Sequence, residues 1–165
     1  MKYNENTAII RPIKPEDNAD LAEMIRDVFI EFDAPKTGTV YSDPTTDNLF
    51  ELFKKDKSAL WVAEVDNKAL GCCGIYPTDG LEENHVELVK YYVSSRIRGK
   101  GIGRKLIEKC IKSAQDFGYT LMYIETVDHF SKALSIYDKL DFKIIDKPLG
   151  NSGHNGCDIW LSKKL

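Results

Sequence analysis

The stretch that decides the fold is Arg98-Gly99-Lys100-Gly101-Ile102-Gly103, which lies between a β-rich run and a strongly helical pattern. The preceding run, 86–93, is rich in β-branched and aromatic residues, which favour strands. Apolar residues then recur at helical spacing over 102–117, and Gly118 follows as a stop signal. The sequence therefore predicts a strand, a glycine-rich turn and a helix in direct succession.

This turn has the properties of an anion-binding site. The first backbone N–H groups of a helix lack intrahelical partners and lie at the positive end of the helix dipole. Glycines let the backbone approach a phosphate closely, while Arg98, Lys100 and Arg104 add positive charge and hydrogen-bond donors. A pyrophosphate group is the ligand that this combination favours.

Three phosphate-binding patterns can be separated by their letters. A P-loop requires G-x-x-x-x-G-K-[ST], which does not occur in the chain. The dinucleotide pattern G-x-G-x-x-G does not fit, because Gly99, Gly101 and Gly103 alternate. What remains is R-x-x-G-x-G, which begins at Arg98 and follows Val93 by five residues. A helix cap with incidental glycines is the structural alternative for this one motif.

The whole chain, 1–165, is expected to form one domain without an internal repeat or a long linker. An amphipathic helix through 21–29 follows a short opening strand, and a polar loop covers 33–46. The turn 66–68 is of the hairpin type. The other expected elements are strands at 8–11, 59–65, 69–75, 121–125, 142–145 and 157–161 and helices at 48–55 and 131–140.

A second motif stands near the end of the chain, where Ala133-x-x-x-Tyr137-Asp138-Lys139-Leu140-Asp141-Phe142 leads from a helix into a strand. Together with the glycine turn, the hairpin and the opening strand, it makes the chain resemble the GNAT superfamily of acyl-CoA N-acyltransferases. The runs 87–92 and 153–158 look like GNAT domains that occur alone or fused to winged-helix regulators. The resemblance implies an α/β (α+β) fold with a mixed, mostly antiparallel sheet, whose central strands splay apart between flanking helices.

The activity implied by the resemblance is transfer of an acetyl group from acetyl-CoA to a primary amine by direct attack. The pantetheine arm of the cofactor is expected between the splayed strands, beside Tyr92 and Val93. The matching positions for its pyrophosphate are Arg98, Gly99, Lys100, Gly101, Ile102, Gly103 and Arg104. Tyr137 matches the general acid of the family, and an ordinary tyrosine, with a pKa of about 10, is protonated at neutral pH. Packing on an apolar helix face is the alternative role for Tyr137.

An isolated acid, Glu87, stands in an otherwise apolar and aromatic strand. Acids there often serve as the base in the family, and burial would raise the pKa of this carboxyl group so that it could accept a proton from an ammonium substrate. Strict alternation places Glu87 on one face with Val89, Tyr91 and Val93. A charge on a solvated face, or one paired with Lys90 across a bulge, fits the sequence equally well.

One departure from the family concerns the cofactor arm. Many members carry an asparagine three residues before the helix alanine, where it bonds the arm, and this chain has Phe130 there. Ser131 or Thr126 is expected to supply the contact instead. The departure also leaves open a second class of function, a non-catalytic acyl-CoA-binding sensor or regulatory module.

Composition limits the partners and the compartment. A net charge of −3 argues against nucleic acid as the main partner, and no run of about 18 apolar residues could cross a membrane. The segment 1–6 lacks the apolar core of a secretory signal, so a cytoplasmic protein is expected. The acceptor is expected to be the amine of a small molecule or peptide, and a homodimer is a candidate assembly.

The sequence indicates neither a metal site nor a disulfide framework. No C-x-x-C pair occurs among the four cysteines, so free thiols are expected in a reducing cytoplasm. The pattern His154-x-x-Cys157 lacks the paired spacing of a zinc site, and no metal is expected. The adjacent Cys72 and Cys73 should point to opposite faces of a strand. A plain surface loop is the favoured interpretation of 150–156, and a border of the acceptor pocket with His154 as a polar contact is the alternative.

Overall fold

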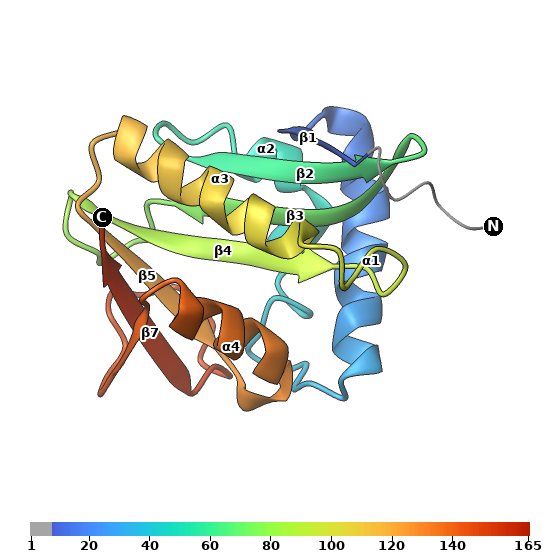
Figure 1. Ribbon diagram of the computed structural model, residues 1–165. Coiled ribbons are helices and arrows are strands. Elements are labelled where there is room, and N and C mark those ends of the chain that lie inside the picture. The colour runs from blue at the N-terminus through green and yellow to red at the C-terminus, as the bar shows by residue number, and fades with distance from the viewer. Residues whose placement is uncertain (1–7) are drawn as a thin grey trace.

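A seven-stranded sheet with the strand order β1-β2-β3-β4-β5-β7-β6 organises the chain in the computed structural model, which describes residues 8–165 (Figure 1). Neighbouring strands are antiparallel except β4 and β5, which run parallel. Helices flank the sheet, so the expected mixed, mostly antiparallel α/β fold is confirmed (Figure 1). The elements are β1 (Ile9–Pro12), α1 (Asn18–Glu31), α2 (Leu49–Leu52), β2 (Ala59–Val65), β3 (Lys68–Tyr76), β4 (His85–Val93), α3 (Ile102–Asp116), β5 (Leu121–Thr126), α4 (Ser131–Lys139), β6 (Lys143–Ile145) and β7 (Ile159–Lys164).

The order of these elements is the predicted one, and most boundaries agree to within one residue, but those of the last strand and the second helix differ more. The apolar pattern predicts the last strand at 157–161, whereas β7 covers Ile159–Lys164 because its backbone pairs with the whole of β5, polar positions included. The second helix is predicted over 48–55, whereas α2 covers Leu49–Leu52 only. The charged run 54–57 has no apolar face to bury, and turns replace the helix there. The segment 1–6 lies outside the described residues.

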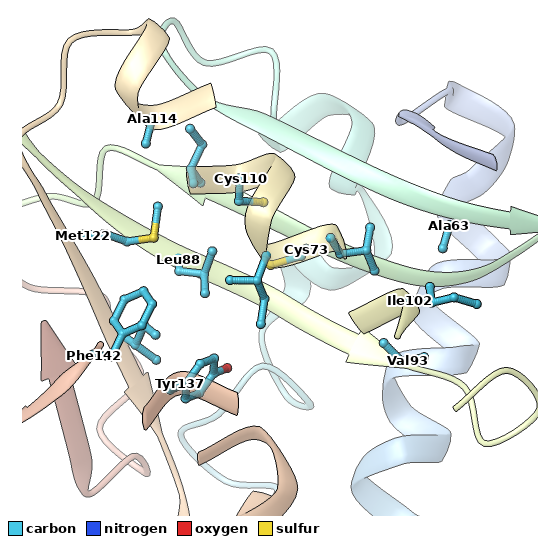
Figure 2. Close-up of a cluster of buried hydrophobic side chains, with 14 of the residues drawn as sticks. Ala63, Cys73, Leu88, Val93, Ile102, Cys110, Ala114, Met122, Tyr137 and Phe142 are labelled. Carbon is cyan, nitrogen blue, oxygen red and sulfur yellow. The ribbon is translucent and has the colours of Figure 1, made fainter. Parts of the chain in front are cut away.

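Two hydrophobic clusters lie on the two faces of the sheet. One packs beneath α3 and α4 and includes Cys73, Cys110 and Tyr137, as Figure 2 shows. The other packs beneath α1 and α2 and includes Phe29 and Cys72. The expectation that Cys72 and Cys73 point to opposite faces is therefore confirmed, and all four cysteines are free thiols.

The two central strands diverge, as the resemblance implies. β4 and β5 pair only at their beginnings, from His85 opposite Leu121 to Glu87 opposite Tyr123. Beyond this point β4 continues to Val93, and no strand within residues 8–165 pairs with it on its β5 side. The sheet therefore opens between the two strands, next to the start of α3 and to α4 (Figure 1).

A β-bulge in β4 reverses the alternation of its side chains. Lys90, with φ +55°, is the extra residue between two paired positions of β4 and β3. Those positions are Val89 with Gly74 and Tyr92 with Cys72. Before the bulge Glu87 points away from the core beneath α3 and α4, whereas Tyr91 and Val93 contact that core. The expectation that Glu87 shares a face with Tyr91 and Val93 is wrong, because it assumed unbroken alternation.

Candidate active site

The glycine-rich turn leads from the end of β4 into α3, which begins at Ile102. Gly99 and Gly101 have φ values of +80° and +76°, in the left-handed region that residues with a Cβ disfavour. Gly103 serves another purpose, because a Cβ at this position would collide with the hydroxyl group of Tyr91. Two glycines therefore shape the backbone of the turn, and the third lets Tyr91 reach the start of the helix.

A groove of about 300 Å³ runs from this turn along the end of β4 to α4. The lining includes most positions at which the sequence places the cofactor: Tyr92, Val93, Arg98, Gly99, Gly101, Ile102, Gly103 and Arg104. Lys100 and Ser131 are exposed and lie outside the lining, and Thr126 lines a neighbouring cavity instead. The N–H groups at the start of α3 suit a phosphate. The edge of β4 that faces β5 is unpaired within residues 8–165 beyond Glu87, and its backbone groups suit an extended amide chain.

The side chain of Arg98 has a structural task in addition to its charge. Its Nε donates to the carbonyl oxygen of Val93 at 2.8 Å, and its two terminal nitrogens bind the carboxylate of Glu31 at 2.6 and 2.8 Å. The guanidinium group also lies over the ring of Phe32, 4.9 Å from its centroid. Arg98 thus fastens the turn to the end of β4 and to the end of α1, and part of its charge is neutralised by Glu31.

A smaller cavity of about 70 Å³ adjoins the groove where β4 and β5 separate. It brings together the two residues that the sequence singles out for chemistry, Glu87 from β4 and Tyr137 from α4. The two spaces share walls formed by Tyr91, Tyr92, Phe130 and Ala133. A thiol ester bound along the groove could therefore present its acyl group to both candidate catalytic residues.

Tyr137 lies deep in the molecule, in the space between α4 and β4 (Figure 2). It is 4 % exposed, and its ring packs against those of Tyr91 and Phe142, with centroids 6.0 and 5.8 Å away. Burial, with smaller contributions from neighbouring titratable groups, raises the pKa of Tyr137 well above its usual value. The hydroxyl group therefore keeps its proton at neutral pH, as a proton donor must.

Glu87 is buried, which removes the solvated-face alternative. Only 3 % of the residue is exposed, and Oε1 has no hydrogen-bond partner within residues 8–165. Burial first, and then the charge of Glu125, raise the pKa of Glu87 to about 8, although Lys90 and Thr78 act in the opposite direction. Ion pairing with Lys90 is absent from the described part of the chain. Near neutral pH the carboxyl group can therefore exchange a proton with a bound amine.

Two loops that are far apart in the sequence close the cavity on the α1 side. Nε2 of His154 lies 2.7 Å from Oδ2 of Asp43, and the backbone N–H of Gly156 donates to the carbonyl oxygen of Gly38 at 2.8 Å. Burial raises the pKa of Asp43, but hydrogen bonds from His154 and Thr45 outweigh it and lower the value to about 2. His154 of the loop 150–156 thus lines the cavity, which differs from the favoured interpretation of a plain surface loop, and Asp43 was not anticipated from the sequence.

Phe130, which stands where many family members have asparagine, belongs to an aromatic cluster. Its ring lies 5.4 Å from that of Phe29, 5.9 Å from that of Phe32 and 6.2 Å from that of Tyr92. These edge-to-face contacts form an apolar wall between the groove and the cavity. A phenyl ring cannot replace the amide hydrogen bond, so the main-chain edge of β4 is the polar surface left for an amide chain.

No helix within 8–165 is both long and apolar enough to cross a bilayer. Over the same range, no group of three or more His, Cys, Asp or Glu side chains is arranged to hold a metal ion.

The chain is similar to known acetyltransferases in sequence and in fold. Residues 22–142 match the model of the acetyltransferase (GNAT) family. The N-acetyltransferase YjgM of Escherichia coli (strain K12) is 32% identical over 158 residues, which cover 95% of both chains. A GNAT-family acetyltransferase of Staphylococcus aureus Mu50 shares the fold with a TM-score of 0.83 at 21% identity, covering 96% of this chain and 99% of that one.

A further structure connects this fold with coenzyme A. The PaiA N-acetyltransferase of Thermoplasma acidophilum, solved in complex with coenzyme A, has a TM-score of 0.74 at 19% identity and covers 96% of this chain and 99% of its own. Together with the extent of the family match, these similarities show that the chain belongs to the acetyltransferase (GNAT) family, the acyl-CoA-dependent N-acetyltransferases.

Proposed function

We propose that the chain transfers the acetyl group of acetyl-CoA directly to a primary amine, with Glu87 as the general base and Tyr137 as the general acid. The observation that carries this proposal is the cavity at the end of the groove, which both side chains line. Because β4 and β5 separate there, residues attached to different layers of the molecule can act on one reacting centre. The experiment that tests it is the release of CoA thiol in the presence of amines.

The proposed step is balanced in bonds and protons. Ionised Glu87 takes a proton from the ammonium form of the acceptor, and the free amine attacks the thioester carbonyl carbon. The new C–N bond forms, the C–S bond breaks, and Tyr137 donates its proton to the departing sulfur. The nitrogen loses its second proton to solvent as the amide forms, Tyr137 regains a proton from solvent, and Glu87 releases its proton to solvent. The net change converts the ammonium ion and the thioester into an amide, a thiol and one released proton.

The turn and the groove supply the binding of acetyl-CoA in this proposal. The helix-start N–H groups beside Gly101 and Gly103 accept the pyrophosphate, and the open edge of β4 bonds the pantetheine amides. Binding alone, as in a sensor module, is the second function that the sequence leaves open. It is not favoured, because a sensor needs no buried carboxyl group beside a buried tyrosine at the acyl end of the groove.

The importance of close packing at the turn can be tested with Gly103→Ala. The added methyl group displaces the hydroxyl group of Tyr91, which lines both spaces, so the KM for acetyl-CoA should rise roughly tenfold, or about 1.4 kcal/mol. Adding Tyr91→Phe removes the colliding oxygen and should restore much of the loss. Steady-state kinetics of the two single variants and the double variant measure the coupling. Purely additive effects would show that this contact is unimportant.

The proposal extends to the compartment, since free cysteines fit a protein of the reducing cytoplasm.

The proposal also includes a homodimer that pairs through β6. β6 is the last strand of the sheet, and Ile144 at its centre is 74 % exposed, which is unusual for an edge strand that stays unpaired. Light scattering should give twice the 18.7 kDa of one chain, and Ile144→Asp should halve that mass. A parent protein that is monomeric at high concentration would contradict the dimer.

A further inference from the structure

The acceptor cavity is lined by one acidic and one basic side chain whose polar atoms are incompletely paired. Oε1 of Glu87 is fully buried and has no partner among the described residues. Lys90, 5 % exposed, lines the same cavity, and over 8–165 its ammonium group makes neither an ion pair nor a hydrogen bond. Oε1 of Glu87 is the fully buried side-chain atom without a partner among the described residues, and the nitrogen of Lys90 is not such an atom. This nitrogen is therefore accessible, and the space that Lys90 lines is the cavity.

The other charged groups around the cavity are already satisfied. Asp43 accepts from the backbone N–H of Thr45 at 2.9 Å and pairs with His154 at 2.7 Å. Glu125 accepts from the hydroxyl group of Tyr123 at 3.0 Å and from the hydroxyl group of Ser152. In this part of the described structure, Oε1 of Glu87 and the ammonium group of Lys90 therefore remain without a hydrogen-bond or ion-pair partner.

The β-bulge explains how these two groups come to lie on the same side of the sheet. In a regular strand Lys90 and Glu87 would point to opposite faces, since they are three residues apart. The bulge turns Lys90 toward Asp43 and Glu87, whose charges both act on it. Burial outweighs these two carboxylates and lowers the pKa of Lys90. The side chains of the protein thus compensate the ammonium form of Lys90 only in part, and an anion bound beside it would favour that form.

An incompletely compensated buried charge is costly, and in an enzyme cavity a ligand of opposite charge accounts for it. The free ammonium group of Lys90 calls for an anion, and the carboxyl group of Glu87 calls for a cation. The cavity measures about 70 Å³, well below the roughly 300 to 1,000 Å³ of pockets for drug-sized ligands. An acceptor that fits the cavity should therefore be small and should carry one charge of each sign.

We infer that the acceptor is a small zwitterion of the amino-acid class, whose ammonium group is bound by Glu87 and whose carboxylate is bound by Lys90. This inference rests on the proposed function and names the substrate class of the same site. It makes Lys90 a residue that determines specificity: it selects the acceptor through its carboxylate and takes no part in moving protons. Polyamines and neutral amines lack that carboxylate and should be poor acceptors.

The test compares acceptors that differ in the carboxylate alone. Alanine, serine and aspartate are each compared with the corresponding α-carboxamide, and putrescine represents amines with a second positive charge. With the parent protein, kcat/KM for thiol release should be roughly tenfold or more higher for at least one amino acid than for its amide, which is what one charge-assisted contact contributes. Amides or putrescine that react as well as or better than every amino acid would overturn the inference.

Lys90→Met removes the ammonium group and keeps a long apolar side chain. It should lower kcat/KM for the preferred amino acid roughly tenfold or more. The kcat/KM for the corresponding amide should stay within about threefold of the parent value, so that the preference for the acid disappears. Lys57→Met is the matched control, since Lys57 also has a positive φ, of +56°, but is exposed and outside the cavity. The control should keep the preference of the parent, and an equal loss for acid and amide in Lys90→Met would contradict the inference.

Product binding separates failure of this inference from failure of the proposed function. Isothermal titration with N-acetylalanine, N-acetylserine and N-acetylaspartate and with their amides needs no turnover. At least one acid should bind to the parent about tenfold more tightly than its amide does. The same acid and its amide should bind to Lys90→Met with equal affinity. If no amine releases thiol, the proposed function fails, and titration alone decides the inference. Equal binding of every acid and amide by the parent would overturn the inference even if turnover is observed.

Discussion

The Tyr137→Phe variant should lose about a hundredfold or more in kcat, because general acid catalysis typically contributes 10²- to 10⁴-fold, with about 10² as the lower bound. Its effect should fall on kcat rather than on the binding of acetyl-CoA, since the phenyl ring preserves the packing against Tyr91 and Phe142. Initial rates of thiol release at saturating acetyl-CoA, together with the Kd for acetyl-CoA, measure the two quantities separately.

Tyr119→Phe is a matched control for this loss. Tyr119 is also buried, and its hydroxyl group donates to the carbonyl oxygen of Lys57 at 2.9 Å, outside the groove and the cavity. The control should keep the kcat of the parent and lose about 1 kcal/mol of stability with that hydrogen bond. A Tyr137→Phe enzyme with undiminished kcat would remove this tyrosine from the mechanism and leave packing as its role.

The Glu87→Gln variant should be the second large effect, again about a hundredfold or more in kcat/KM. Glutamine has the same shape but cannot accept a proton or bind the ammonium ion through charge. Glu64→Gln is the control, because Glu64 pairs with Arg11 at 2.5 Å and lines neither space. The control should leave turnover unchanged. Equal kcat/KM in Glu87→Gln and parent at pH 8 would show that another group activates the amine.

The pH dependence of turnover gives a second readout of Glu87. With a pKa of about 8, the carboxyl group is mostly protonated at pH 6.5 and can act as a base only after it ionises. The kcat/KM of the parent should therefore rise through about pH 8, in addition to any change from the acceptor itself. In Glu87→Gln this part of the profile should disappear.

Stability measurements check that the glutamine variant is folded. The pKa of Glu87 is raised from about 4.3 in the unfolded chain to about 8 in the folded protein, so the folded state holds an extra proton between these values. The resulting stability is present below pH 4 and is lost as the pH rises through 8. Glu87→Gln cannot acquire the buried charge, and at pH 9 it should melt at a higher temperature than the parent.

The features that the sequence predicted well are those set by neighbouring residues. The turn requires glycines at the left-handed positions 99 and 101 and a helix that starts at Ile102, and both are visible as letters. Tyr137 is placed by a helix pattern that leads into Phe142. Because these signals are local, they identified the groove and one wall of the cavity before any long-range contact was known.

The features that the sequence missed depend on contacts between distant segments or on one irregular residue. The contact between Asp43 and His154 joins residues 111 positions apart, and no pattern in the sequence pairs them. The face to which Lys90 points depends on a bulge that only the pairing of β4 with β3 reveals. Arg98 was expected to serve the anion, and its contact with Glu31 at the end of α1 again joins distant segments.

The most direct test of the central claim is the stoichiometry of a single reaction mixture with acetyl-CoA and an amino-acid acceptor. Thiol release is followed by absorbance, the acetylated acceptor is quantified by mass spectrometry, and the intact protein is weighed at intervals. The account predicts one acetylated amine per thiol and no acetyl group on the protein. Acetyl-CoA that binds in the groove but releases no thiol with any amine would contradict it, and an acetylated protein that accumulates during turnover would contradict direct transfer.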